Sequence, residues 1–169
     1  RQEVGAILLE TKALGFSYDG ITEALDDVSL TIRSGEMISI LGSNGAGKST
    51  LASLLMGVLT PDRGEIIMDG VDLAGYSASQ RSSLIGFVMQ NPNHMISCDV
   101  VYDEVAFALR QQGYGEEEIR DRVMDVLGLC ALREYHRWPI SALSYGQKKR
   151  VTIASILVTH PRLLIPHEP

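Results

Sequence analysis

The sequence predicts an α/β fold in which strands dominate the first 90 residues and helices dominate the rest. Alternating or β-branched apolar runs recur up to that point. A glycine-rich turn at residues 42–47 separates one such run from a helical pattern, and apolar residues recur at helical spacing from Asn91 onward. The length of 169 residues fits one domain with a buried core.

The predicted strands are short apolar runs bounded by glycine and aspartate clusters. They cover residues 6–16, 28–32, 37–41, 65–68, 84–89 and 162–165. Because the run at 37–41 leads directly into the glycine-rich turn, it is expected to feed a helix through that turn.

The predicted helices are defined by apolar residues that share one face. The faces consist of Leu51, Leu54, Leu55 and Val58; of Val101, Val105, Ala108 and Leu109; and of Ile119, Val123, Val126 and Leu127. Three glutamates at 116–118 favour the positive end of the third helix. A last helix is expected from about Gly146 to about Thr159.

The net charge is −6, with 21 acidic and 15 basic residues. This field repels nucleic-acid phosphates, so we expect no nucleic-acid partner. The apolar stretch at 151–165 contains several polar residues and cannot span a bilayer. The N-terminus lacks the pattern of a secretory signal, which favours the cytosol.

Cys98 and Cys130 stand alone, without C-x-x-C spacing, and are expected to be free thiols in a reducing compartment. The histidines form no recognisable ligand cluster with them. We therefore expect no structural transition metal.

Residues 42–49 match the phosphate-binding pattern G-x-x-x-x-G-K-[ST] between a predicted strand and a predicted helix. Glycines let successive backbone N–H groups curl round phosphate oxygens. Lys48 would reach the β and γ phosphates of a nucleotide, and the Ser49 hydroxyl would ligate Mg²⁺. A glycine-rich turn without a ligand is the alternative. The predicted binding residues are Gly42, Ser43, Asn44, Gly45, Ala46, Gly47, Lys48, Ser49 and Thr50.

A P-loop alone admits GTPases, kinases, helicases and motors. Residues 143–147, Leu-Ser-Tyr-Gly-Gln, followed by Lys148, Lys149 and Arg150, resemble the LSGGQ signature of the ABC ATPases. The resemblance covers the whole chain and implies ATP and Mg²⁺ as ligands. It also implies that a second ABC ATPase subunit forms a head-to-tail dimer with this one, each signature closing over the other subunit's ATP. The signature residues are Leu143, Ser144, Tyr145, Gly146 and Gln147.

Two further positions resemble family motifs. Tyr18 lies about two dozen residues before the P-loop, where the family has an aromatic residue that stacks on adenine. Gln90 matches the Q-loop glutamine, which implies contact with Mg²⁺ and relay of the nucleotide state to a membrane partner. A core tyrosine and a loop glutamine without a role are the respective alternatives.

The C-terminal residues resemble the family's Walker B strand. Glu168 falls on the glutamate that polarises the attacking water, although an exposed terminal glutamate is the alternative. His167 stands where the family has an aspartate that holds Mg²⁺ through water, and imidazole is a poor ligand for that hard ion. Pro166 stands in a predicted central strand, where proline removes a ladder donor.

The resemblance implies a P-loop NTPase core with N-terminal antiparallel β strands and an inserted helical subdomain. Residues 1–169 are expected to be a single ABC ATPase domain, with the core at 1–90 plus 148–169 and the helical subdomain at 91–147. The family places its D-loop, switch histidine and closing strands after this point. We therefore expect the domain to be incomplete at its C-terminus.

Residues 90–133 resemble the ATPase subunits of energy-coupling factor transporters for vitamins and for cobalt or nickel. Residues 91–93 and 103–107 carry this likeness. It implies transmembrane transporter subunits as partners, a peripheral location on the inner face of the cell membrane, and a partner surface near residues 95–101. The transported substrate, its direction, and the choice between homodimer and heterodimer stay open.

Two alternative functions remain. One is a nucleotide-binding module that no longer hydrolyses ATP, because His167 replaces the aspartate and Tyr145 replaces the first paired glycine of the signature. The other is a soluble ABC ATPase of DNA repair or translation. Compact spacing and acidic charge count against the second alternative.

Overall fold

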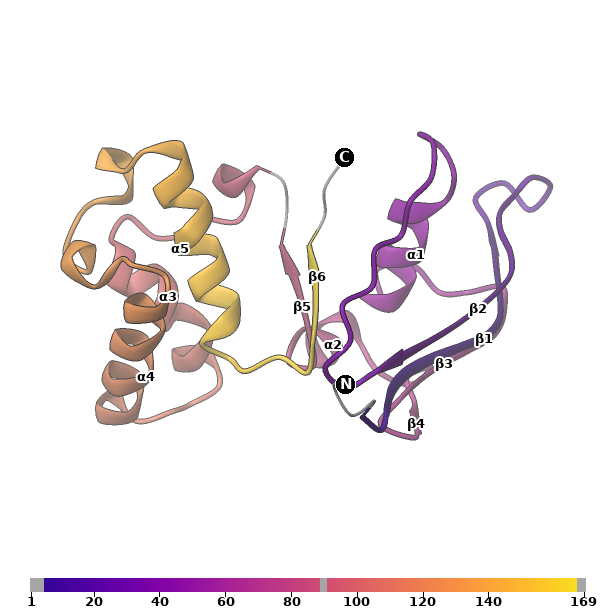
Figure 1. Cartoon of the computed structure of the whole chain (residues 1–169), viewed down its shortest axis with the longest axis horizontal. Helices are drawn as coiled ribbons and strands as arrows, with labels where there is room; N and C mark the ends of the chain where they lie inside the picture. Colours follow the sequence, from indigo (N-terminus) through magenta and orange to yellow (C-terminus); the bar gives the residue numbers. More distant parts are fainter. Residues whose placement is uncertain (1–4, 89–90, 167–169) are drawn as a thin grey trace. The chain divides into compact units, whose positions relative to one another are not determined.

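The computed structural model describes residues 5–88 and 91–166. These residues divide into two units, one ending at Ser82 and the other beginning at Ser83 (Figure 1). Helices and strands are mixed along the chain, and the predicted α/β class is confirmed. The finer division into a core and a helical subdomain stays a prediction.

An antiparallel sheet organises the first unit, in the order β2-β1-β3-β4. Its strands are β1 (Ile7–Ser17), β2 (Glu23–Arg33), β3 (Arg63–Met68) and β4 (Val71–Asp72). The predicted antiparallel strands at the N-terminus are therefore confirmed. β1 pairs with β2 on one side and with β3 on the other, and it carries the apolar residues Leu9 and Leu14 into the core.

Two helices accompany this sheet, α1 (Lys48–Leu55) and α2 (Ala78–Ser82). α1 begins directly after the glycine-rich turn, as predicted, and ends before Val58. Its buried face includes Leu51 and Leu54, and it contacts β2 beside the sheet (Figure 1). Burial of this face stabilises a helix too short to be stable alone.

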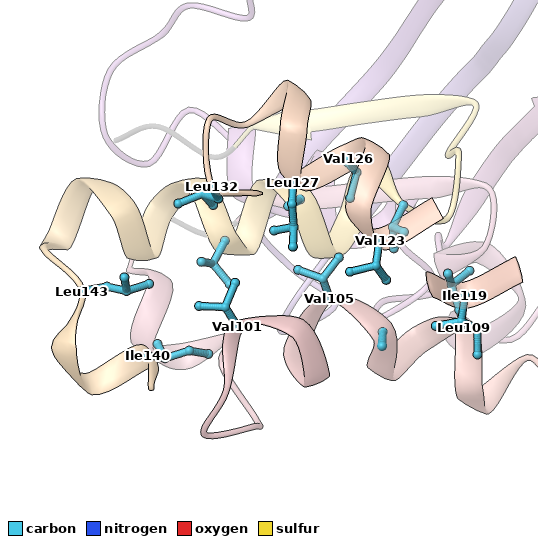
Figure 2. Packing of buried hydrophobic residues seen from close by; sticks show 14 residues of the cluster. Val101, Val105, Leu109, Ile119, Val123, Val126, Leu127, Leu132, Ile140 and Leu143 are labelled. Atoms are coloured by element: carbon cyan, nitrogen blue, oxygen red, sulfur yellow. The ribbon is translucent and has the colours of Figure 1, made fainter. Parts of the chain in front are cut away.

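The second unit is mainly helical, with α3 (Val101–Gln111), α4 (Glu116–Leu129) and α5 (Tyr145–Leu157). The predicted helices of this region are confirmed. Their apolar faces form one buried cluster, to which α3 and α4 contribute most of the residues labelled in Figure 2. Short 3₁₀ turns lie at Pro92–His94, Arg133–Tyr135 and Ile140–Ala142.

A parallel pair of strands, β5 (Ile85–Val88) and β6 (Leu163–Pro166), completes the second unit. α5 packs closely on β5, because a Cβ at Gly86 would lie 2.4 Å from Ile156 Cγ2. Pro166 pairs with Val88 at the end of β6. A strand end tolerates the missing N–H donor better than a strand interior does.

The predicted strand at residues 37–41 is wrong in this structure. The segment forms no ladder within the described residues, and Met37 and Leu41 are 97% and 91% exposed. The apolar pattern indicates a residue run suited to a buried strand, but a strand also requires a paired neighbour. No described strand pairs with these residues.

Candidate functional site

Backbone geometry shapes the turn at residues 42–47, which is the glycine-rich part of the predicted phosphate-binding pattern. Gly45 and Gly47 adopt left-handed φ angles of 85° and 81°. Gly47 is also crowded, since a Cβ there would lie 2.6 Å from the carbonyl oxygen of Ala24 in β2. The left-handed backbone and this close contact would each make a residue with a Cβ at position 47 destabilising. The glycine therefore sets the path by which the turn enters α1.

The side chain of Lys48 folds back over this turn. Its ammonium donates to the carbonyl oxygens of Gly42 and Ser43, the latter at 2.9 Å. An ammonium has three donors, so one further N–H remains after these two bonds. The turn and the lysine together form a compact positive site in which the charge is held over the loop.

The N-terminus of α1 opens onto the same turn. No side chain among the described residues caps it, and the N-cap residue is Gly47. The first N–H groups of an uncapped helix are available to an anion, and the helix dipole favours negative charge there. Ser49 is exposed at this end, whereas Thr50 is buried. A hydroxyl oxygen such as that of Ser49 suits a hard cation like Mg²⁺.

Tyr18 lies in the same unit, directly after β1. Its hydroxyl is 3.1 Å from Thr50 Oγ1, and its ring meets Phe16 edge-on at 4.9 Å between centroids. The side chain is 68% exposed, which does not fit the alternative of a core tyrosine. The structure therefore brings the predicted stacking residue next to the helix that follows the phosphate-binding turn.

The LSGGQ-like motif forms the start of α5 in the second unit. The Ser144 hydroxyl accepts from the Gln147 N–H at 3.3 Å, and the Gln147 side chain accepts from the Ser144 N–H at 2.9 Å. These two bonds form a capping box. Leu143 is buried just before the cap and anchors it to the core.

Tyr145 follows the cap serine and is 58% exposed. It stands at the first turn of α5, where the family motif has glycine. The ring therefore lies on the surface of the turn that carries Ser144, and it adds bulk to that surface. Arg150 anchors the same helix by donating to the Cys130 carbonyl oxygen at 3.1 Å.

Gln90, His167 and Glu168 lie outside the described residues, so their predicted roles stay predictions. The described strands that precede them are informative. β5 and β6 run in parallel and end opposite each other at Val88 and Pro166. In α/β folds, ligand-binding residues follow the carboxyl ends of parallel strands.

The predicted partner surface near residues 95–101 is held by a buried carboxylate. Glu104 Oε2 accepts from the N–H groups of Ser97 and Cys98 at 2.8 and 2.7 Å. Backbone bonds then join this segment to the chain ahead of the signature. The Asp99 carbonyl oxygen accepts from the Ile140 N–H at 2.7 Å, and the Trp138 carbonyl oxygen accepts from the Val101 N–H at 3.1 Å.

Sequence reasoning missed Arg81, which is 4% exposed in the first unit. Its guanidinium donates to the carbonyl oxygens of Leu54 and Leu73 at 2.8 and 2.6 Å, and to that of Leu55 at 3.3 Å. Two of these carbonyls end α1, where a cation is favourable. Burial lowers the pKa of Arg81 from its ordinary value. An arginine in a short polar helix carries no sequence signal of burial.

Both cysteines are free, and burial raises the pKa of the Cys98 and Cys130 thiols. Within residues 5–88 and 91–166, no three His, Cys, Asp or Glu side chains gather closely enough to hold a metal ion. None of the helices in these ranges is long and apolar enough to cross a membrane.

The glycine-rich turn, the helix that follows it and the mixed fold are the features of a P-loop NTPase fold. A family model described as ABC transporter matches residues 25–169. This match covers most of the chain, and the chain therefore belongs to the ABC transporter family.

Curated relatives from bacteria are named as ABC transporter ATP-binding proteins. A putative ABC transporter ATP-binding protein of Photobacterium profundum is 57% identical over 162 residues, and one of Vibrio vulnificus is 55% identical over 162 residues. Each match covers 96% of this chain. The chain spans 29% of the length of the first relative and 28% of the second.

Solved structures agree with this fold. The cbiO1 protein of Clostridium perfringens, described as part of the ABC transporter complex cbiONQ, matches with a TM-score of 0.89 and 37% identity, over 96% of this chain and 66% of its own. A bacterial Atm1-family ABC exporter with ATP bound matches with a TM-score of 0.78 and 26% identity. That match covers 98% of this chain and 30% of the exporter.

Proposed function

We propose that this chain binds MgATP and forms the ATP-hydrolysing domain of an ABC transporter. The observation that carries the proposal is the turn at 42–47, with Gly47 in the left-handed region and the Lys48 ammonium held over the loop. Backbone N–H groups and an ammonium in this arrangement suit the triphosphate of a nucleotide. The proposed binding residues are those of the P-loop named above, together with Tyr18.

The base of the nucleotide would stack on Tyr18. The exposed ring offers a π face, and its hydroxyl contact with Thr50 ties the ring to the helix that holds the phosphates. Stacking adds affinity without strong selection among bases. The distance between base and phosphates is thus set by one unit of the chain.

Hydrolysis would use residues near the carboxyl ends of β5 and β6. Glu168 would polarise the attacking water, and Gln90 and Ser49 would contact the metal. Mg²⁺, when bound, neutralises charge on the phosphate oxygens. Glu168 and Gln90 each follow the described strand ends by two residues.

A second ABC ATPase domain would complete each site through its signature. The capping box holds the Ser144 hydroxyl at the start of α5, where helix N–H groups favour a γ phosphate. Binding of two nucleotides would join the domains, and hydrolysis would separate them. The Tyr145 ring would narrow the space through which this signature approaches the γ phosphate of the nucleotide bound to the second domain.

The motion would pass through the second unit to a membrane partner on the inner face of the cell membrane. Backbone bonds link residues 95–101 to Trp138 and Ile140, just ahead of the signature. A displacement of residues 95–101 would therefore be transmitted through a few peptide groups to the residues just ahead of the signature. The likeness to cbiO1, described as part of the cbiONQ transporter complex, supports an energy-coupling factor type.

A hydrolysis-deficient nucleotide-binding module is the second candidate. His167 in place of aspartate and the exposed ring of Tyr145 favour it, because both weaken steps that follow binding. A soluble ATPase of DNA repair or translation is not favoured, since the relatives described above carry transporter names.

Binding and turnover separate these candidates. ATP affinity and phosphate release are measured on the full-length protein and on its His167→Asp variant, together with copurification of membrane subunits. The proposal predicts ATP binding, phosphate release and copurifying membrane proteins. ATP binding without phosphate release supports the second candidate. If His167→Asp does not restore phosphate release, the weak Mg²⁺ binding expected from His167 is rejected as the cause.

A further inference from the structure

The ring of Tyr18 is exposed and yet fixed in place. Phe16 holds its edge at 4.9 Å with an interplanar angle of 89°, and Thr50 holds its hydroxyl at 3.1 Å. An exposed tyrosine ordinarily samples several rotamers. Contacts at both ends of this side chain select one of them.

The turn that follows Tyr18 is organised by one carboxylate. Asp19 Oδ1 accepts from the N–H groups of Ile21 and Thr22 at 2.8 and 2.7 Å. The Ser17 hydroxyl lies 2.9 Å from the same oxygen. These bonds lower the pKa of Asp19 to about 2, the bond from Thr22 contributing most. The carboxylate is therefore charged at neutral pH.

The residue before Tyr18 is fixed as well. The Ser17 N–H donates to Asp62 Oδ2 at 2.7 Å, and the Ser17 hydroxyl lies 2.8 Å from the Thr22 carbonyl oxygen. Asp62 in turn donates its N–H to the Gly15 carbonyl oxygen at 3.0 Å. The backbone is thus anchored on both sides of Tyr18, at the tip of the β1–β2 hairpin.

We propose that Asp19 is a positioning residue for nucleotide recognition, whose carboxylate holds the hairpin turn so that the Tyr18 ring is ready to stack on the base. The proposal rests on the function proposed above and adds a residue to it. A ring that is already ordered loses little freedom when a ligand binds. We call the hydrogen bonds that Asp19 accepts the clamp. Without the clamp, nucleotide binding must also order the turn, and the affinity for the nucleotide falls.

The location of the clamp distinguishes this role from general stabilisation. Asp19 and its neighbours at the hairpin tip are exposed, and Ile21 is 87% exposed. Loss of the clamp therefore uncovers no part of the buried core. The functional link runs through Tyr18, which lies between Ser17 and Asp19.

The test compares ATP affinity across three variants of the full-length protein, by calorimetry. Asp19→Ala is expected to weaken ATP binding by about two- to tenfold, the usual cost of ordering one side chain. Asp19→Asn keeps an oxygen that accepts both N–H groups, so it is expected to restore most of the affinity. Asp72→Ala is the matched control, since Asp72 Oδ1, at the exposed end of β4, also accepts from a backbone N–H two residues ahead, that of Ala74. Its ATP affinity should equal that of the wild type.

A double-mutant cycle and a ligand without a base complete the test. In a Tyr18→Ala background, Asp19→Ala should cause no further loss, because the clamp acts only through that ring. Inorganic triphosphate should bind wild type and Asp19→Ala equally. The inference is overturned by unchanged ATP affinity in Asp19→Ala, by an equal loss in the Tyr18→Ala background, or by an equal loss for triphosphate. Failure of the wild type to bind either ligand would instead reject the proposed function itself.

Discussion

Replacing Gly47 by alanine tests whether the backbone path of the turn shapes the phosphate site. The residue has a φ of 81°, and a Cβ would lie 2.6 Å from the Ala24 carbonyl oxygen and 2.7 Å from Leu25 Cδ2. A left-handed conformation costs a residue with a Cβ about 1–2 kcal/mol. Forcing a methyl group into a packed site costs about 1–3 kcal/mol more.

A stiffer unfolded chain offsets about 0.4–1 kcal/mol of this loss. We therefore expect Gly47→Ala to lower the free energy of unfolding by about 2–4 kcal/mol. Gly70→Ala is the matched control, because Gly70 has a φ of 79° but no atom lies within 4 Å of the point that a Cβ would occupy. It should lose about 1 kcal/mol or less, from backbone strain alone.

Urea denaturation gives the stabilities, and calorimetry at a temperature where both variants are folded gives the ATP affinities. Gly47→Ala should also weaken ATP binding, because relief of the contact with β2 moves the turn that carries the N–H groups. Gly70→Ala should bind as the wild type does. If Gly47→Ala matched Gly70→Ala in stability and the wild type in affinity, the turn's path would not be the determinant inferred here.

Three further predictions concern polar groups that each stabilise a local structure within one unit. Arg81→Met removes the bonds to the end of α1 and should lower the free energy of unfolding by about 2–4 kcal/mol in urea denaturation; a stability equal to the wild type contradicts the role inferred for it. Ser144→Ala removes half of the capping box and should cost about 1 kcal/mol, whereas Ser144→Asp should keep most of the stability because its carboxylate can cap the helix. Asp19 has a pKa of about 2 in the folded state and 3.8 in the unfolded state. Its carboxylate therefore stabilises the fold fully above pH 3.8, and this stabilisation is lost as the pH falls to about 2. The difference in unfolding midpoint between wild type and Asp19→Ala should be constant from neutral pH downward and then shrink in this acid window, and a constant difference throughout would contradict the assignment.

The sequence predicted most elements because their signals are local. The antiparallel strands, α1 and the helices of the second unit follow from period, glycine placement and charge at helix starts. The capping box was not predicted, although Ser144 and Gln147 stand at the spacing of such a box near the expected start of the last helix. Residues 37–41 were mispredicted because an apolar pattern cannot report whether a neighbouring strand pairs with it.

The candidate site divides in the same way. The P-loop residues were predictable, because the phosphate pattern and its glycines are a continuous motif. The contacts of Tyr18 with Thr50 and of Arg81 with the end of α1 join residues more than 25 positions apart. Such pairings depend on how the sheet and helices pack, and no local pattern encodes them.

The proposed function requires residues 42–49 to bind the phosphates of a nucleotide. Calorimetric titration of ATP into the full-length wild type, Lys48→Ala and Lys12→Ala tests it most directly, since Lys12 is an exposed lysine of β1 in the same unit. We predict binding by the wild type and by Lys12→Ala, and an affinity lower by roughly tenfold to a hundredfold for Lys48→Ala. A folded wild type that binds no ATP, or a Lys48→Ala variant with unchanged affinity, would contradict this requirement.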